Sequence, residues 1–116
     1  MALFTDGVQS ALERAMDGVM QRQRVSAQNI ANVMTPGYQA QRVSFEDSLA
    51  SALATGDDPG RVGIDVAPTG EQSDARGNNV DLVGENTTLM RSGLQYEALV
   101  QATNYRFNVL HTALRS

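Results

Sequence analysis

Residues 82–114 read LVGENTTLMRSGLQYEALVQATNYRFNVLHTAL and decide the fold, because one stripe of positions runs through them at alternating steps of four and three. This spacing is typical of a helix with a coiled-coil-like seam. The seam positions are Leu82, Asn86, Leu89, Gly93, Tyr96, Val100, Thr103, Phe107, Leu110 and Leu114. We therefore predict a long C-terminal helix over residues 80–116, whose seven apolar seam residues form an assembly seam.

A second helical stripe occupies the N-terminal part of the chain. Its positions are Val8, Leu12, Ala15, Val19, Gln23, Ala27, Ile30 and Met34, and Leu12, Val19 and Ile30 are predicted to join the assembly seam. The helix must end at Met34 or Thr35, because the residue before a proline is disfavoured in the α region. Pro36 and Gly37 then have the types expected at the centre of a type II turn.

The segment between the two helices has weaker patterns. Ser44 is predicted to cap a short helix in which Phe45, Leu49, Ala52 and Leu53 share one face. Residues 54–79 are rich in glycine and predict a loop, apart from Val62, Ile64 and Val66, whose alternation indicates a half-buried strand. Residues 38–43 are the candidate partner strand.

These patterns predict a mainly α fold made of one structural domain. Two long terminal helices form a coiled-coil-like pair, joined by a turn, a short helix and an irregular loop that can hold a short β-strand pair. The parts are residues 1–35 for the N-terminal helix, residues 36–79 for the turn, short helix and glycine-rich connection, and residues 80–116 for the C-terminal helix.

Composition excludes most kinds of chemistry. The 116 residues contain no cysteine, one histidine and no lysine, so we expect no catalytic residue, no metal site and no cofactor, and hence no enzyme. The net charge of -4 argues against nucleic acid, because proteins that bind it neutralise phosphates with clustered basic residues. No apolar run approaches the length of about 18 residues that spans a membrane, and no cleavable signal peptide is expected.

The predicted helices are long for so short a chain, about 40 and 50 Å at 1.5 Å per residue. Two interpretations remain open at this stage. The chain is either a small helical hairpin that folds alone, or a subunit whose helices complete their burial against neighbouring copies.

The sequence SAQNIANVMTPGY at residues 26–38 favours the second interpretation, a subunit that packs against neighbouring copies. It resembles the N-terminal signature of bacterial flagellar axial proteins of the rod and hook class. The signature residues are Asn29, Ile30, Ala31, Asn32, Thr35, Pro36, Gly37 and Tyr38. Within that class, the short length and residues 42–46 and 77–82 are most similar to the proximal rod proteins. The resemblance covers about two thirds of the chain and leaves residues 54–76 unmatched.

The resemblance implies a structural subunit of the flagellar basal-body rod, which polymerises through its terminal helices and transmits torque for motility. It also implies partners: further copies, other flagellar rod proteins, the protein that joins the membrane ring to the rod, and the flagellar export gate. The implied location is the basal body, spanning the periplasm, after type III export without a cleavable signal peptide.

Alternatives for the signature and for the whole chain stay open. Asn29 and Asn32 either bind a neighbouring chain or satisfy carbonyls at the helix end, and Tyr38 is either an interface residue or a clamp on Met34. The runner-up function is a coiled-coil adaptor or secretion chaperone with no flagellar role.

Overall fold

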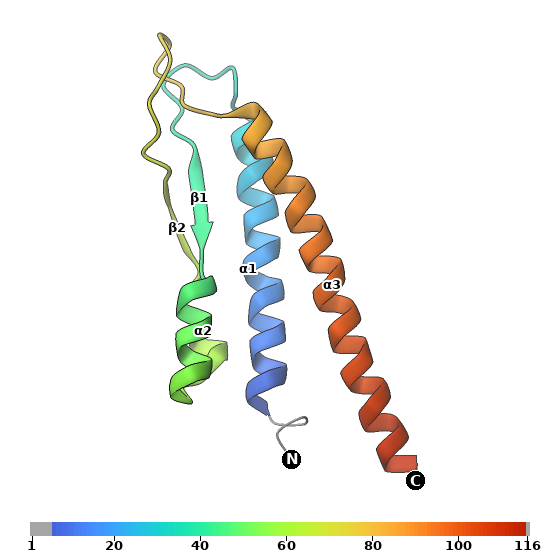
Figure 1. The fold of residues 1–116 in the computed structure, drawn as a ribbon. Helices are drawn as coiled ribbons and strands as arrows, with labels where there is room; N and C mark the ends of the chain where they lie inside the picture. The colour runs from blue at the N-terminus through green and yellow to red at the C-terminus, as the bar shows by residue number, and fades with distance from the viewer. Residues whose placement is uncertain (1–5, 116) are drawn as a thin grey trace.

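Two antiparallel helices, one near each terminus, set the length of the molecule. The computed structural model describes residues 6–115, in which α1 (Asp6–Ala31) lies between α3 (Leu82–Arg115) on one side and the remaining elements on the other (Figure 1). The principal extents are 65 × 26 × 14 Å, and the radius of gyration is 17.7 Å. A compact chain of this size has a radius of gyration of about 13 Å. The molecule is therefore elongated and flat, as the long helices predict.

The end of α1 differs from the prediction. The helix ends at Ala31, three to four residues before the expected end at Met34 or Thr35. The reason is local: the Asn32 N–H is shared between the carbonyls of Gln28 and Asn29, both at 3.1 Å, and the Val33 N–H donates to the Ile30 carbonyl at 3.2 Å, so the helical ladder tightens into turns after Ala31. The chain then passes through tight turns to Pro36, so the proline influences the helix end only indirectly.

A small antiparallel sheet follows the turn. β1 (Gln41–Ser44) pairs with β2 (Asp65–Pro68), with Val43 opposite Val66. The predicted partner strand is confirmed with its bounds shifted toward the C-terminus. The predicted strand around Val62 lies too early, because Val62 instead follows the short 3-10 helix η2 (Pro59–Arg61). β2 is exposed along its length and not half-buried as expected.

The short helix α2 (Glu46–Thr55) continues directly from β1. Ser44 is not its cap, because Ser44 still belongs to β1 and Phe45 occupies the capping position without a side-chain hydrogen bond. Phe45, Leu49 and Ala52 share a buried face as predicted, whereas Leu53 is half exposed.

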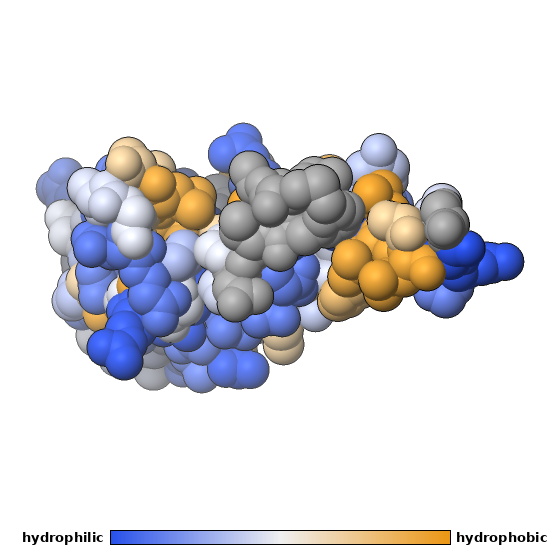
Figure 2. Space-filling view, turned by 90° about the horizontal axis from the view of Figure 1, so that it is seen from below, coloured by the Kyte–Doolittle hydropathy of each residue, from blue (hydrophilic) through white to orange (hydrophobic). Residues whose placement is uncertain are grey.

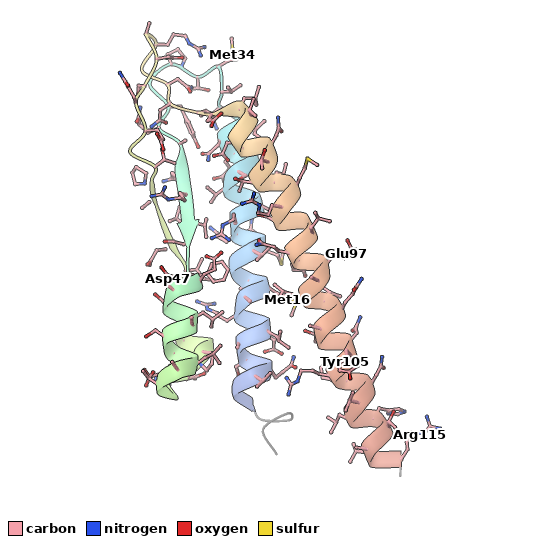
Figure 3. All side chains as sticks on the ribbon, in the orientation of Figure 1. Met16, Met34, Asp47, Glu97, Tyr105 and Arg115 are labelled. Atoms are coloured by element: carbon pink, nitrogen blue, oxygen red, sulfur yellow. The ribbon has the colours of Figure 1, made fainter. Side chains whose placement is uncertain are left out.

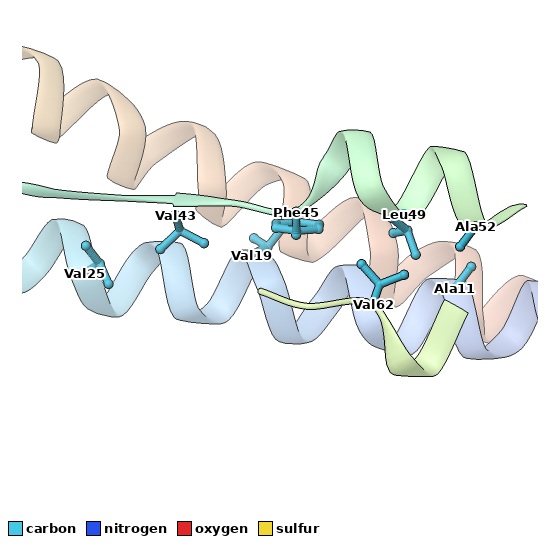
Figure 4. Close-up of a cluster of buried hydrophobic side chains, with 8 residues drawn as sticks. All are labelled: Ala11, Val19, Val25, Val43, Phe45, Leu49, Ala52 and Val62. Carbon is cyan, nitrogen blue, oxygen red and sulfur yellow. The ribbon is translucent and has the colours of Figure 1, made fainter. Parts of the chain in front are cut away.

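The hydrophobic core lies between α1 and the β1–α2 segment (Figure 4). Its buried members are Ala11, Val19, Val25, Val43, Phe45, Leu49, Ala52 and Val62. Gly18 lies directly under the Phe45 ring, and a Cβ at this position would overlap the ring. This close approach explains a glycine in the helix interior, where it is otherwise unfavourable by about 1 kcal/mol relative to alanine.

One arginine fixes α2 against α1. The Arg22 guanidinium binds both carboxylate oxygens of Glu46, at 2.6 and 2.7 Å, and donates to the Val43 carbonyl at 2.7 Å. It also lies over the Phe45 ring, 5.1 Å from the centroid. Because the guanidinium stabilises the charged form of the carboxylate, the pKa of Glu46 is lowered from its ordinary value.

The fold class predicted from the patterns is confirmed: two long terminal helices, a turn, a short helix and a small strand pair. No helix among residues 6–115 combines the length and the apolar character needed to cross a membrane.

Candidate functional site

Asn29 occupies the centre of the signature and is 1% exposed. Its side chain pairs with the backbone at the start of β1: Nδ2 donates to the Gln41 carbonyl at 2.8 Å, and Oδ1 accepts the Gln41 N–H at 3.1 Å. The Tyr38 hydroxyl donates to the same Oδ1 at 3.4 Å. Asn29 therefore joins the last turn of α1 to the strand that follows, within one chain.

The turn after α1 is built as the sequence predicts. The Tyr38 N–H donates to the Thr35 carbonyl at 3.2 Å, and Gly37 has φ +79°, the positive value that a type II turn requires at this position. Of the two alternatives for Asn32, its amide adopts the local one, because it bonds to the carbonyl of Gln28 in its own helix. Its Oδ1 accepts the Thr35 hydroxyl at 3.1 Å.

Two further asparagines, which sequence analysis did not place in the site, complete this end of the molecule. Asn78 donates from Nδ2 to the carbonyls of Asn32 and Thr35, both at 2.9 Å. The Oδ1 of Asn79 accepts the Ala40 N–H at 2.7 Å. Both are buried. We call Asn29, Asn32, Asn78 and Asn79 the asparagine cluster; the signal that pointed to its second half was the similarity of residues 77–82 to rod proteins.

The loop before α3 also contacts the turn through its backbone. The Gly37 N–H donates to the Arg76 carbonyl at 2.9 Å, and a Cβ on Gly77 would lie 3.4 Å from the Gly37 Cα. The Asn78 backbone N–H donates to the Asp74 carboxylate at 3.1 Å, and the Arg76 guanidinium lies 3.0 Å from it. These contacts lower the pKa of Asp74 from its ordinary value, because they favour the charged carboxylate.

The other signature residues have supporting positions. Ile30 is half-buried, Ala31 is the exposed last residue of α1, and Pro36 is exposed in the turn. Tyr38 does not clamp Met34, because its hydroxyl reaches Asn29 and Met34 is largely exposed.

The face of α3 that contacts α1 shares Tyr96 and Thr103 with the predicted seam and is otherwise displaced from it by about one residue. It is centred on Ser92, Tyr96, Leu99, Thr103 and Arg106. Ser92, which is 1% exposed, is the one buried residue of this 34-residue helix, and Arg106 donates to Gln9 at 2.9 Å. The predicted seam follows the spacing of apolar residues. The observed contact includes Ser92, whose small side chain lets the two helices approach closely.

The predicted seam residues fall into three environments. Val19 is buried in the chain's own core. Those half-buried along the helices are Leu12, Ile30, Leu89, Tyr96 and Val100. Those exposed are Leu82 (43%), Phe107 (55%), Leu110 (37%) and Leu114 (78%). Seen from below, the hydrophobic surface gathers over the C-terminal end of α3 (Figure 2).

Titratable side chains do not converge on a chemical site. Within residues 6–115, no group of three or more His, Asp or Glu side chains is placed to hold a metal ion. The arrangement offers a hydrogen-bonded turn at one end and exposed apolar helix surface at the other, which suits assembly with other chains.

Comparison with curated proteins gives a family. The chain is 36% identical to the flagellar basal body rod protein FlgB of Bacillus subtilis (strain 168), over 98% of this chain and 97% of that protein. The chain belongs to the FlgB family of flagellar basal body rod proteins. FlgB of Escherichia coli (strain K12) is 31% identical over 90% of each chain, and FlgB of Aeromonas hydrophila is 27% identical over 99% of this chain. No family model matches the chain.

Membership of the FlgB family confirms the resemblance drawn from residues 26–38 and 77–82. As a FlgB-family protein, the chain is a structural subunit of the flagellar basal-body rod. Because the matches cover nearly the full length of the chain, they include residues 54–76, for which the sequence patterns alone indicated no relative.

Proposed function

We propose that this rod subunit polymerises through its terminal helices and, in the assembled rod, transmits torque. The observation that carries the proposal is the composition of the α3 surface. Ser92 alone is buried in this helix, while large apolar residues remain exposed along it. These exposed residues are Leu82, Val83, Met90, Leu94, Tyr105, Phe107, Leu110 and Leu114.

A helix with so little burial gains little stability from its own chain. Most helical stability in proteins comes from packing of an apolar face, and contiguous exposed apolar surface marks interaction sites. Neighbouring chains that cover α3 supply the missing packing. The predicted assembly role of Leu82, Leu89, Tyr96, Val100, Phe107, Leu110 and Leu114 belongs to this proposal, as does that of Leu12 and Ile30 on α1.

The proposal includes specific neighbours and a location. Beyond further copies, the partners are other flagellar rod proteins, the protein that joins the membrane ring to the rod, and the flagellar export gate. The rod would span the periplasm, and the chain would reach it by type III export without a cleavable signal peptide. The signature turn and the FlgB relatives support these statements.

The proposed role is mechanical and needs no chemistry. The absence of cysteine and lysine and the single histidine support a non-enzymatic protein without cofactor or metal, and the acidic charge balance supports one that does not bind nucleic acid. The proposed subunit does not insert into the membrane.

Complementation tests the proposal. Cells that lack this protein should neither build a complete rod nor swim, and expression of the chain should restore both, with the chain present in purified basal bodies. Recovery of swimming without the chain in the basal bodies would contradict a structural role. A stable dimer in solution that never enters basal bodies would instead favour the adaptor or chaperone.

A further inference from the structure

An apolar groove of about 440 Å³ runs between the three helices. Its floor is Val19 of α1, one wall is formed by Phe45, Leu49 and Leu53 of α2, and the other wall contains Ala98 and Leu99 of α3. α1 lies between α2 and α3 (Figure 1), so the groove has one of these helices on each side of its floor. Helical grooves of this kind accept the apolar face of another helix.

The end of α3 carries a matching apolar surface. We call residues 107–115 the α3 tip. Phe107, Leu110 and Leu114 are exposed on it, although they continue the α3 side that faces α1 further up the helix. They remain uncovered because Arg106 already contacts Gln9, in the first turns of α1, and the tip extends past that contact.

The charges near the two surfaces are opposite. Residues 46–58 contain four acidic residues and no basic one, and among them Asp47 and Asp57 form no ion pair within residues 6–115. The tip contains Arg115 and no acidic residue. Figure 3 shows Asp47 at the start of α2 and Arg115 at the far end of α3. Such complementarity favours one orientation of approach and suppresses others.

The tip cannot occupy the groove of its own chain. Gln95, Ala98 and Leu99 line the groove, and α3 is a continuous helix from Leu82 to Arg115. A helix rises 1.5 Å per residue, so the tip of the same helix lies about 15 Å beyond the wall it would need to face. Among residues 6–115, the exposed apolar segment that can fill the groove is therefore the tip of a second copy.

We propose that the α3 tip of one copy binds in the groove between α2 and α3 of a second copy. This inference rests on the proposed rod function and names the contact that links successive subunits. The two surfaces differ, so each copy offers one tip and one groove. Contacts of this heterologous kind generate helical filaments when the rotation between neighbouring copies does not close a ring, which is the arrangement proposed for the rod.

The contact is small. Three apolar side chains bury much less than the roughly 800 Å² per partner of a stable complex, so it cannot hold two free copies together. It stabilises the assembly only in combination with the other contacts each subunit makes in the rod. The purified chain is then expected to be monomeric.

Crosslinking of cysteines tests the contact, because the chain has no cysteine of its own. The variant Leu53→Cys with Leu114→Cys places one thiol in the groove and one on the tip. In basal bodies purified from swimming cells, a short bismaleimide should join this variant into covalent dimers, trimers and longer multimers. Ala50→Cys with Leu110→Cys provides a second, independent pair across the same contact.

Matched controls separate this contact from others. Leu53→Cys with Glu97→Cys should give no multimers, because Glu97 is exposed on the side of α3 that faces away from α1 (Figure 3). Dimers from Leu114→Cys alone would overturn the proposal by showing that tips pair with tips. Crosslinks to a different rod protein in place of a second copy would also overturn it.

The result also distinguishes the contact from the rod function. Swimming cells whose basal bodies contain the chain, but give no multimers with either cysteine pair, overturn the tip-in-groove contact and leave the structural role intact. Basal bodies that lack the chain overturn the structural role itself.

Discussion

The two ends of the molecule are stabilised in different ways. At the end that contains the turn, buried asparagine side chains of α1 and of the loop before α3 bind the backbone just after α1 and at the start of β1. At the other end, the last turns of α3 carry exposed Phe107, Leu110 and Leu114. The first end meets its hydrogen-bonding needs within one chain, whereas the second presents apolar surface that is exposed in the part of the chain the structure describes.

This difference shows that one short chain can have a fixed backbone geometry at one end and unburied apolar surface at the other. Buried amides require partners at fixed positions, so the asparagine cluster specifies the angle at which the chain leaves α1 and enters α3. Apolar surface is less selective in direction, so the tip can remain exposed until neighbours arrive. Four changes test whether the ends differ in this way.

The largest expected effect concerns the open end. The double change Phe107→Ala and Leu110→Ala should abolish rod formation and swimming, because the loss of apolar contact recurs at every subunit. Both side chains are exposed in the single chain, so the free energy of unfolding of the monomer should change by less than about 1 kcal/mol. Motility in soft agar and urea unfolding of the purified chain measure the two effects.

Glu97→Ala is the control for this double change. Glu97 is exposed on the side of α3 that faces away from α1 (Figure 3), and its loss should leave swimming near normal. Normal swimming by the double variant would contradict the prediction that Phe107 and Leu110 contact neighbouring subunits.

At the end that contains the asparagine cluster, Asn29→Ala should instead lower the stability of the monomer. This change leaves the N–H and carbonyl of Gln41 without their side-chain partner in a buried position. We expect a loss of about 2–3 kcal/mol in the free energy of unfolding of the monomer. Urea unfolding measures it, with exposed Asn104→Ala as control, and equal stability of the two variants would mean that the cluster adds nothing to the single chain.

A smaller effect is expected in the turn. Gly37→Ala should destabilise the monomer by about 1 kcal/mol, because a side chain is disfavoured at φ +79° even though the space around it is open. Gly63→Ala is the control, since Gly63 lacks positive φ and a Cβ there makes ordinary contact. Gly56 is unsuitable as a control because its φ is +81°. A Gly37 variant as stable as the Gly63 variant would argue against a demanding turn.

The smallest expected effect depends on pH. The pKa of Asp74 is lowered from its ordinary 3.8 in the folded chain, so its contribution is present above that value and lost as the pH falls through the folded pKa. NMR of the Asn78 amide should show its hydrogen bond to Asp74 weakening in acid, and Asp74→Asn should remove this transition. Unchanged titration of the Asn78 amide in the variant would exclude Asp74 as its cause.

The helices were predictable from sequence because their burial pattern repeats along many residues, which gives a strong periodic signal. The type II turn was predictable because Pro36 and Gly37 restrict the backbone locally. The contact face of α3 was not, because its most buried residue is a serine, and small polar residues leave no mark in a hydrophobic pattern.

In the asparagine cluster, too, features set by local sequence were predictable and those set by distant contacts were not. The first half of the asparagine cluster lies in the signature and was identified from it, but the role of Asn29 as a partner of β1 depends on where Gln41 lies in space. Asn78 and Asn79 contact residues about forty positions earlier, and no local pattern reports such a contact. The fit of Gly18 under the Phe45 ring depends likewise on a contact between residues far apart in the sequence.

The 14 Å thickness has a further consequence for how stability can grow. In a molecule about one helix thick, the exposed surface grows in proportion to chain length. Longer helices or loops would therefore add almost no buried core. Stacking a second copy converts an outer face into an inner one, and copies that bind only the folded form raise its stability by mass action. In the proposed assembly, each subunit therefore buries apolar surface against adjacent subunits, and the local concentration of subunits adds to the stability of each fold.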